Sequence, residues 1–276
     1  MSDGLYPPVR PQSVGEALDL AVRIFRVTLV KCLPYGLLMM VVGQLPNIFN
    51  LVTGRAQAQL GQETRTWWLL EALGTLGALW LMTAMLLRQR SIAQGHAAAT
   101  GEELVNALRR LPGTVALFLA AVLVSVLLLV PVAMVPEAYW AWGLLLVSVP
   151  LTYLSIALSC AWPAQVLAGR SAAGSIGYSL RLVSGNWWRV ATVYTVALAI
   201  ATVFYSVVTV IVLLVTSVLG TLDLAVVTAV ATVSFSAISA AAAPFAGAVL
   251  LALFGDLQVR REGTDLQRRL AGSAAE

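Results

Sequence analysis

Long apolar runs separated by short polar segments make up most of the chain. Six of these runs are long enough to cross a bilayer as helices, which need about 20 residues each. The expected spans are residues 27–52, 67–87, 114–135, 139–166, 190–219 and 224–254. Prolines inside the runs predict kinks, as at Pro34, Pro150 and Pro244. The pattern predicts an all-α fold, a polytopic membrane bundle of six transmembrane helices.

Three amphipathic segments, each just before a span, are typical of helices that lie flat at the cytoplasmic membrane surface. They are residues 13–26, 99–111 and 175–184. Ser13 and Glu16 have capping-box spacing, so the first of these helices is expected to begin there. Pro112 and Gly113 are expected to end the second helix. Gly185 is expected to end the third, and Asn186 to cap the helix that follows.

The third segment connects two apolar runs. Its apolar stripe at helical spacing consists of Ile176, Leu180, Val183 and Trp187, with Arg181 off the stripe. Trp187, Trp188 and Arg189 combine amphipathic rings with positive charge, which favours the headgroup layer of a bilayer. We therefore expect the chain to pass here from the membrane surface into the fifth span.

The three surface segments share a short pattern. Gly15–Leu18, Gly101–Leu104 and Gly177–Leu180 all read Gly-x-x-Leu, and each directly precedes an odd-numbered span. The positions predict a threefold repeat of a surface helix followed by a transmembrane hairpin. The alternative is chance, because the pattern is common in a chain rich in glycine and leucine.

Composition supports a membrane protein and excludes a soluble one. Hydrophobic residues make up 59% of the 276 residues and charged residues 11%, whereas soluble domains carry about 25% charged residues. Six spans leave no room for a separate soluble domain of ordinary size. We expect a mobile proline-rich tail at residues 1–12, one membrane domain at 13–270 and a second tail at 271–276. The basic residues lie at the ends of apolar runs, which suits anionic lipid and not nucleic acid.

The charge distribution predicts the orientation. Fifteen of the seventeen Lys and Arg residues fall on one side of the expected spans, and only Arg55 and Arg65 fall on the other. The positive-inside rule then places both termini in the cytoplasm. No cleaved signal peptide is expected. The preference for Arg over Lys and the high alanine content are typical of a GC-rich bacterial genome, so we expect a bacterial inner membrane.

The two ends of the chain resemble a bacterial family of six-span proteins. The resemblance rests on Arg10–Asp19 and on Phe254–Leu266, which reads FGDLQVRREGTDL. The family is named after the membrane domain fused to some glycerophosphodiester phosphodiesterases, and the resemblance implies a six-span fold. The catalytic domain of those fusions is absent here, so diesterase activity is not implied. Gly255, Gln258 and Thr264 depart from the residues usual in the family.

The chain lacks a pattern typical of catalysis, and we expect no enzyme, no cofactor and no metal. His96 is the single histidine and lies in a polar loop. Cys32 and Cys160 lie inside apolar runs without metal-ligand spacing, so buried free thiols are expected. Lys31 lies shallow in the first run, where its ammonium group is expected to reach lipid phosphate.

Two sets of residues are candidates for contacts. Candidates for contact with lipid or a protein partner at the cytoplasmic face are Arg23, Arg26, Trp187, Trp188, Arg189, Arg260 and Arg261. The alternative for Arg260 and Arg261 is an ion pair with Asp256 or Glu262. Candidates for lining a polar cavity are Glu71, Ser148, Thr152, Ser155 and Ser159, with helix packing as the alternative for the hydroxyls and snorkelling for the acid.

Two functions remain open from the sequence. The leading hypothesis is a non-enzymatic membrane scaffold, anchor or accessory and regulatory module that binds anionic lipid or a protein through its basic face. The alternative is a small transporter or lipid-handling protein. A close-packed bundle favours the first hypothesis, and an open cavity among spans four to six favours the second.

Overall fold

The computed structural model describes residues 4–54, 64–96, 100–218 and 224–263, and these residues form helices without strands. The elements are α1 Val14–Gly43, α2 Leu45–Val52, α3 Arg65–Ala93, α4 Thr100–Ala133, the 3-10 turn η1 Glu137–Tyr139, α5 Trp140–Leu158, α6 Ala161–Ala168, α7 Ala172–Val183, α8 Trp187–Val218 and α9 Leu224–Glu262. Six helical stretches are long and apolar enough to cross a membrane. The prediction of an all-α protein with six spans is confirmed.

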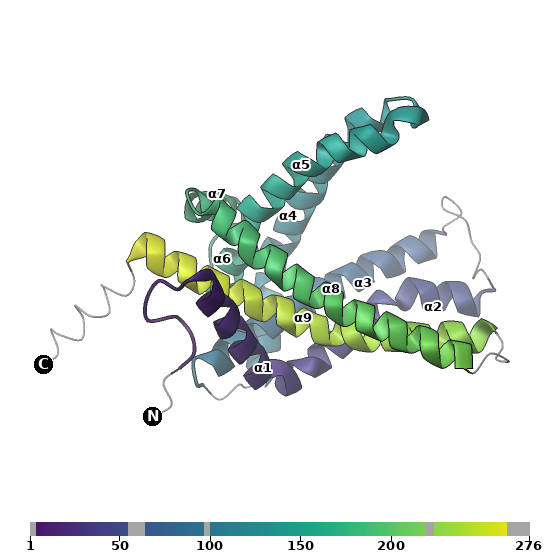
Figure 1. Cartoon of the computed structure of the whole chain (residues 1–276), viewed down its shortest axis with the longest axis horizontal. Helices are drawn as coiled ribbons and strands as arrows, with labels where there is room; N and C mark the ends of the chain where they lie inside the picture. The colour runs from purple at the N-terminus through teal and green to yellow at the C-terminus, as the bar shows by residue number, and fades with distance from the viewer. Residues whose placement is uncertain (1–3, 55–63, 97–99, 219–223, 264–276) are drawn as a thin grey trace, which may run out of the picture.

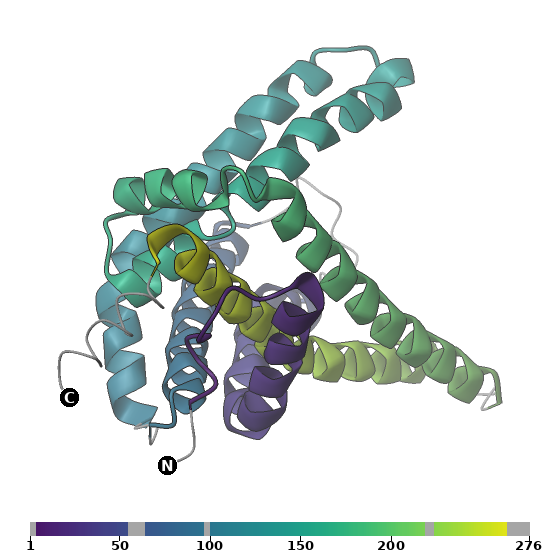
Figure 2. The same ribbon diagram turned by 60° about the vertical axis from the view of Figure 1, so that its left-hand side comes forward.

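Three helical hairpins diverge from one common end of the molecule (Figures 1 and 2). They are α1–α3 with α2 at the far end, α4–α5, and α8–α9. The Gln12 amide donates a hydrogen bond to Asp256 Oδ1 at 2.7 Å. Both described ends of the chain therefore lie at the same end of the bundle, as an even number of crossings requires.

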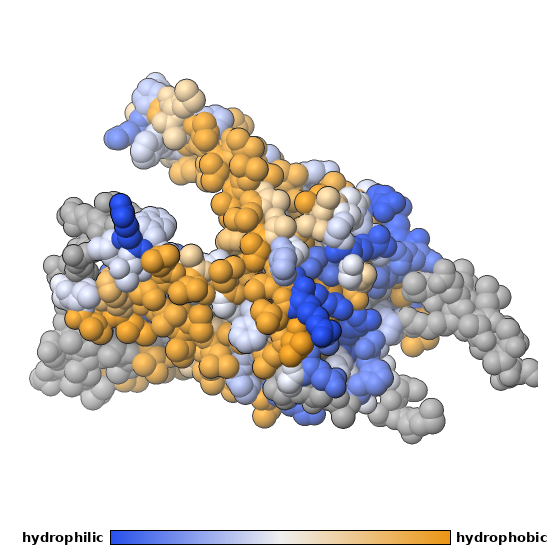
Figure 3. All heavy atoms as spheres, turned by 180° about the vertical axis from the view of Figure 1, so that it is seen from behind, coloured by the Kyte–Doolittle hydropathy of each residue, from blue (hydrophilic) through white to orange (hydrophobic). Residues whose placement is uncertain are grey.

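This common end, which we call the polar end, comprises the start of α1, α4 and α8, the end of α3 and α9, and all of α6 and α7. Most of the hydrophilic surface gathers there (Figure 3). The largest buried cluster also lies at this end and includes Ile24 of α1, Leu86 of α3, Val190 of α8 and Phe254 of α9. Burial at the polar end thus holds the three hairpins together.

The α4–α5 hairpin separates from the other helices away from the polar end, whereas α1 stays packed against α9 as far as Gly36 and Ala240. Only 6% of the most apolar 18 residues is buried in α4 and in α8, against 50% in α9. An open notch divides the α4–α5 hairpin from the rest of the surface, and both sides of the notch are apolar (Figure 3). Most apolar side chains of α4, α5 and α8 are consequently exposed instead of buried between the hairpins.

Two predicted helix boundaries are wrong. The capping box at Ser13 and Glu16 is present, but α1 continues without a break past Arg26. Likewise α4 continues through Pro112. The first two expected surface helices are therefore the opening turns of α1 and α4, continuous with the spans that follow.

A glutamine of α6 binds α4 in the turn that contains Pro112. Gln165 of α6 donates from Nε2 to the Arg110 carbonyl at 3.0 Å, in the proline-containing turn. A Cβ atom on Gly113 would lie 2.4 Å from that nitrogen, so the missing side chain admits the glutamine. Pro112 and Gly113 form a docking place for Gln165 instead of a helix end.

A glutamine also binds α9 at Pro244. This proline lies inside α9, which stays helical to Glu262. Gln89 of α3 donates from Nε2 to the Pro244 carbonyl at 2.7 Å and to Thr28 Oγ1 of α1 at 3.4 Å. The sixth span is therefore continuous past residue 254, as the sequence indicated for the C-terminal segment.

The fourth span is interrupted at a place that the sequence did not indicate. Pro150 lies inside α5, and the break falls at Ser159 and Cys160, between α5 and α6. The third surface helix, by contrast, is separate, and Gly185 follows it with a φ of 80°. Asn186 directly precedes α8, and its capping of that helix stays a prediction. The sequence Gly-Thr-Leu-Asp at residues 220–223 also predicts a tight turn, which lies outside the described residues.

The buried face of α7 differs from the predicted stripe. Its buried residues are Ser175, Tyr178, Ser179, Leu182 and Val183. Leu180 is 43% exposed and Ile176 is half-buried. The small hydroxyl residues let α7 lie close to its neighbours, and Ser179 Oγ donates to the Ala157 carbonyl at 2.7 Å. Most of the predicted apolar stripe is left outside the protein core, where a surface helix would meet lipid.

The three Gly-x-x-Leu segments bury the same positions. The residues two and six places after each glycine are Ala17 and Ala21, Glu103 and Ala107, and Ser179 and Val183, and all six are buried. Thr28 and Thr114 each follow their glycine by 13 residues and bond to Gln89 and Gln165, respectively. In the third unit Val190 stands at that position. The threefold repeat stays a prediction that these parallels favour.

Candidate functional site

Three consecutive residues of α3 contact three different neighbours at the polar end. Arg88 faces α1 and α4, where it bonds to Tyr35 and Glu103. Gln89 faces α1 and α9 through its bonds to Thr28 and Pro244. Arg90 faces α6 and donates from Nη1 to the Leu167 carbonyl at 2.8 Å. Successive helical positions point about 100° apart, so α3 is the central element that positions groups on every side.

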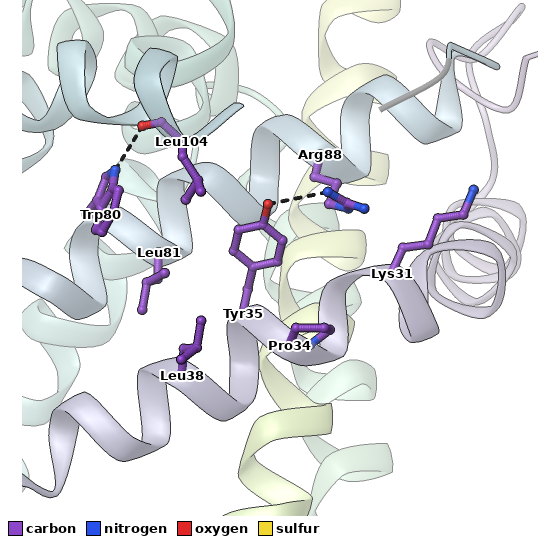
Figure 4. A pocket seen from close by; sticks show the side chains of 8 residues that line it. All are labelled: Lys31, Pro34, Tyr35, Leu38, Trp80, Leu81, Arg88 and Leu104. Carbon is purple, nitrogen blue, oxygen red and sulfur yellow. Dashed lines mark hydrogen bonds between the residues drawn. The ribbon is translucent and has the colours of Figure 1, made fainter. Parts of the chain in front are cut away.

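A crevice of about 340 Å³ opens between α1, α3 and the start of α4 (Figure 4). Its lining residues are Lys31, Pro34, Tyr35, Leu38, Trp80, Leu81, Arg88 and Leu104. The two cationic side chains lie on one side, while Leu38, Leu81, Trp80 and Leu104 lie on the other (Figure 4). The crevice therefore has a basic rim and an apolar body.

The polar wall of the crevice is a hydrogen-bonded trio. Arg88 Nη1 lies 3.2 Å from Glu103 Oε2, and the two side chains are only 13% and 9% exposed. The Tyr35 hydroxyl donates to the same carboxylate oxygen at 3.4 Å and accepts from Arg88 at 3.4 Å. Trp80 is fixed as well, because its Nε1 donates to the Leu104 carbonyl at 2.9 Å. The charge of Arg88 is thus balanced inside the protein.

Lys31 supplies the net charge of the crevice. It lies on α1 beside Pro34 and Tyr35, and its side chain is exposed. A long aliphatic stem lets such a lysine cover apolar surface while its ammonium group stays in a polar layer. Within the described part of the chain no acidic group pairs with Lys31, so the crevice presents one positive charge next to an apolar wall.

A second polar cluster closes the polar end around Asp256. Arg189 of α8 and Arg260 of α9 lie 3.0 and 3.1 Å from its carboxylate, which is fully buried. Both arginines also donate to the Gln12 carbonyl. The predicted ion pair between Arg260 and Asp256 is confirmed.

Tyr178 and Glu262 link α7 to the end of α9. The Tyr178 hydroxyl lies 2.6 Å from Glu262 Oε1. Burial, and next the hydrogen bond to Glu262, raise the pKa of Tyr178 to about 12. The phenol therefore stays protonated and donates its hydrogen to the carboxylate, which ties the surface helix to the last span.

The predicted lipid or partner contacts fall into two groups. Arg23 and Arg26 are exposed, and Trp188 is 79% exposed. Trp187 is half-buried and stacks on Tyr153. The remaining candidates bond within the protein, since Arg189 and Arg260 bind Asp256 and Arg261 donates to Ser184 Oγ.

The predicted cavity residues are not brought together. Ser148, Thr152 and Ser155 are exposed on α5, and Ser159 Oγ donates to the Ile156 carbonyl of its own turn. Glu71 is half-buried on α3, in a different hairpin. None of the five lines the crevice between α1, α3 and α4. As predicted, Cys32 and Cys160 are buried free thiols and His96 is exposed.

Sequence reasoning anticipated only Lys31 among the residues of the crevice. Arg88 and Glu103 are separated in the chain by the loop between α3 and α4, so their pairing has no local pattern. Tyr35 and Trp80 resemble ordinary apolar positions of a span. One signal for this pairing was available in the sequence. Arg88 lies in the last turns of one helix and Glu103 in the first turn of the next, and antiparallel neighbours bring such ends together.

Comparisons with models of known protein families, with curated proteins and with solved structures find no match. The resemblance to the six-span family thus stays a prediction from the two ends of the chain.

Proposed function

We propose that this integral membrane protein is a non-enzymatic lipid-binding protein whose crevice between α1, α3 and α4 holds one anionic phospholipid. The observation that carries the proposal is the polarity of the crevice, with Lys31 and Arg88 at the rim and an apolar wall behind them. A phospholipid has the same division, with a phosphate next to an acyl chain. The ligand comes from the surrounding bilayer.

The charge balance favours an anionic over a zwitterionic lipid. Glu103 neutralises Arg88, which leaves the ammonium group of Lys31 to meet the ligand. A basic side chain close to an anionic membrane surface contributes about 1 kcal/mol per charge. The basic rim at the polar end also agrees with a cytoplasmic position of that end in a bacterial inner membrane.

The arrangement of the hairpins supports lipid handling over a close-packed scaffold. The notch beside α4–α5 leaves apolar surface on both sides, and α4 and α8 bury little of their length. Acyl chains are the natural occupants of such a space in a bilayer. The scaffold or accessory role, with a protein partner at the polar end, stays a prediction.

Native mass spectrometry of the whole chain released from lipid discs tests the proposal. With equal phosphatidylglycerol and phosphatidylcholine in the discs, we expect one retained phosphatidylglycerol. Lys31→Gln should reduce its retention about fivefold, the equivalent of ~1 kcal/mol. Arg23→Gln is the matched control, because Arg23 is an exposed basic residue of the same helix outside the crevice.

The control should retain the lipid as the unchanged protein does. Equal retention by Lys31→Gln and Arg23→Gln would contradict the proposal. A stoichiometric protein partner without bound phospholipid would instead favour the scaffold role.

A further inference from the structure

A second hollow lies on the opposite side of α3 from the crevice. It is a groove of about 390 Å³ that is lined mainly by α3, α4, α6 and α7, with Leu79 and Met82 as the lining residues of α3. Successive helical positions point about 100° apart, so these two residues face away from the α3 residues that line the crevice. No residue lines both hollows. The groove is therefore a separate feature, and its interpretation does not depend on the proposed function.

The groove runs along one face of α4. Thr114, Leu117, Ala121 and Val124 line it at intervals of three and four residues, and together they cover about 15 Å of the helix. The wall that α3 contributes is shorter, because Leu73, farther from the polar end, does not line the groove and is 60% exposed. The groove thus begins where α3 and α4 meet and continues along α4 toward the interior of the bilayer.

The walls of the groove are apolar. None of the side chains that line it in the described part of the chain is charged. The hydroxyl of Thr114 is used within the protein, since Thr114 Oγ1 lies 3.1 Å from Gln165 Oε1 and 3.3 Å from the Arg110 carbonyl oxygen. Trp162 of α6 adds an indole ring, which favours the level of the lipid headgroups. Such walls suit hydrocarbon, because burying a polar group without a partner is costly.

The volume of the groove decides between a lipid chain and a protein helix. A helix about 10 Å wide that covered the same length of α4 would occupy roughly 1,200 Å³, about three times the volume of the groove. A single hydrocarbon chain is much narrower than a helix. Ala120, Ala121 and Ala161 leave space for its width between α4 and α6.

Charge decides between a free fatty acid and a phospholipid as the source of the chain. A fatty acid would bring a carboxylate, which finds no cation among the described residues that line the groove. The ester group of a phospholipid is uncharged, and its headgroup stays outside the groove at the membrane surface. The phospholipid is therefore the better match.

We propose that this groove binds one acyl chain of a membrane phospholipid. The chain enters from the surrounding bilayer and lies along α4, with its ester end near Trp162 and the surface helix α7. It fills the space that the three alanines leave, and it thereby completes the packing between α3, α4 and α6 at the base of the α4–α5 hairpin.

A variant that fills the groove tests the proposal. Ala121 is exposed, so the ring in Ala121→Phe enters the groove without displacing protein atoms. In native mass spectrometry of the whole chain released from discs of phosphatidylcholine, we expect this variant to retain about tenfold less lipid, the effect of about two methylene groups losing their apolar surroundings. Ala116→Phe is the matched control, because Ala116 is an exposed alanine of α4 outside the groove.

The control and Lys31→Gln should both retain phosphatidylcholine as the unchanged protein does, which separates the groove from the crevice. Equal retention by Ala121→Phe and Ala116→Phe would contradict the proposal. Retention of a fatty acid in place of a phospholipid would contradict it as well.

A second measurement needs no variant and so does not depend on the folding of a mutant. Phosphatidylcholine with a diazirine in one acyl chain attaches on irradiation to the side chains beside that chain, and peptide mass spectrometry locates the adducts. We expect adducts at Phe118 and Trp162 to survive a chase with unlabelled phosphatidylcholine. Adducts at Phe204, an exposed residue of α8, should disappear in the chase. Equal loss from both places overturns the proposal, whatever the variants show.

Discussion

Asp256 is a fully buried carboxylate that joins three parts of the chain. It accepts from the Gln12 amide, from Arg189 of α8 and from Arg260 one turn later on α9. The two arginines in turn donate to the Gln12 carbonyl. A single acid thus fixes the N-terminal segment against the last two helices.

Asp256→Asn should therefore be strongly destabilising. It removes the negative charge and leaves Arg189 and Arg260 without a carboxylate, which in buried pairs costs about 3 kcal/mol. Unfolding in a detergent titration measures the change. Asp19→Asn is the control, since Asp19 is an exposed acid of α1. Equal stability of the two variants would mean that the ion pairs contribute nothing net.

The structure leaves no room for a side chain at residue 255. A Cβ atom on Gly255 would lie 2.7 Å from Tyr6 Cε2 and 2.8 Å from Pro8 Cδ. Tyr6 is 6% exposed and belongs to the main buried cluster. An aromatic ring from the N-terminal segment, which we expected to be mobile, occupies the space beside residue 255.

At the scale of elements, glutamines connect proline-containing helices to their neighbours. Gln165 reaches the turn of α4 with Pro112, and Gln89 reaches the turn of α9 with Pro244. The sequence indicated both prolines as breaks or kinks, because a proline removes a backbone hydrogen bond. The two glutamines lie 53 and 155 residues from these prolines, respectively, so local patterns could not show the contacts.

The effect of Gly113→Ala on the free energy of unfolding should change sign when Gln165 is also replaced. In the unchanged protein the new methyl group displaces Gln165, and we expect a loss of about 1–2 kcal/mol from the broken hydrogen bond. In the Gln165→Ala background the space beside residue 113 is empty. Because alanine is a better helix former than glycine, Gly113→Ala should then raise the stability by up to about 1 kcal/mol. Gly101→Ala is the control, because Gly101 also lies in α4 and a Cβ atom there would have no neighbour within 4 Å. Equal effects of Gly113→Ala in both backgrounds would contradict the docking of Gln165.

The number and placement of the spans could be predicted because each requires a long apolar run. The helix start at Ser13 and the break at Gly185 were also predictable, since both depend on neighbouring residues. The boundary expected near Arg26 was wrong because a change from polar to apolar residues does not interrupt hydrogen bonding within α1. The crevice depends on pairs such as Arg88 and Glu103 from different helices, which a pattern along one helix does not reveal.

At the scale of the whole molecule, the hairpins are joined at one end and separate at the other. The predicted cavity residues on α5 lie on the separated part, with their side chains exposed. In a bilayer these positions meet acyl chains unless another protein covers them. Because the α4–α5 hairpin stands apart, the hydroxyl residues of α5 are expected to contact lipid and not to line a buried polar cavity.

Nitroxide labels on cysteine variants test this arrangement. At Ser148, Thr152 and Ser155 we expect mobile spectra with high accessibility to dissolved oxygen and low accessibility to a water-soluble nickel complex, because oxygen concentrates in the hydrocarbon core. Ser239 is the control, since it bonds to Tyr205 inside the α8–α9 hairpin and its label should be restricted. Immobile labels on α5 would mean that the hairpins close or that a partner covers this face.

The bond between Gln12 and Asp256 joins residues that leave the ribosome far apart in time. Gln12 precedes all six described spans, but its acceptor belongs to α9, the sixth of them. Until α9 arrives, Tyr6 lacks the surface beside Gly255 and Arg189 lacks its carboxylate. The contact between Gln12 and Asp256 can therefore form only after the six described spans have been synthesised, and a chain halted before Asp256 would leave these groups exposed to proteolysis.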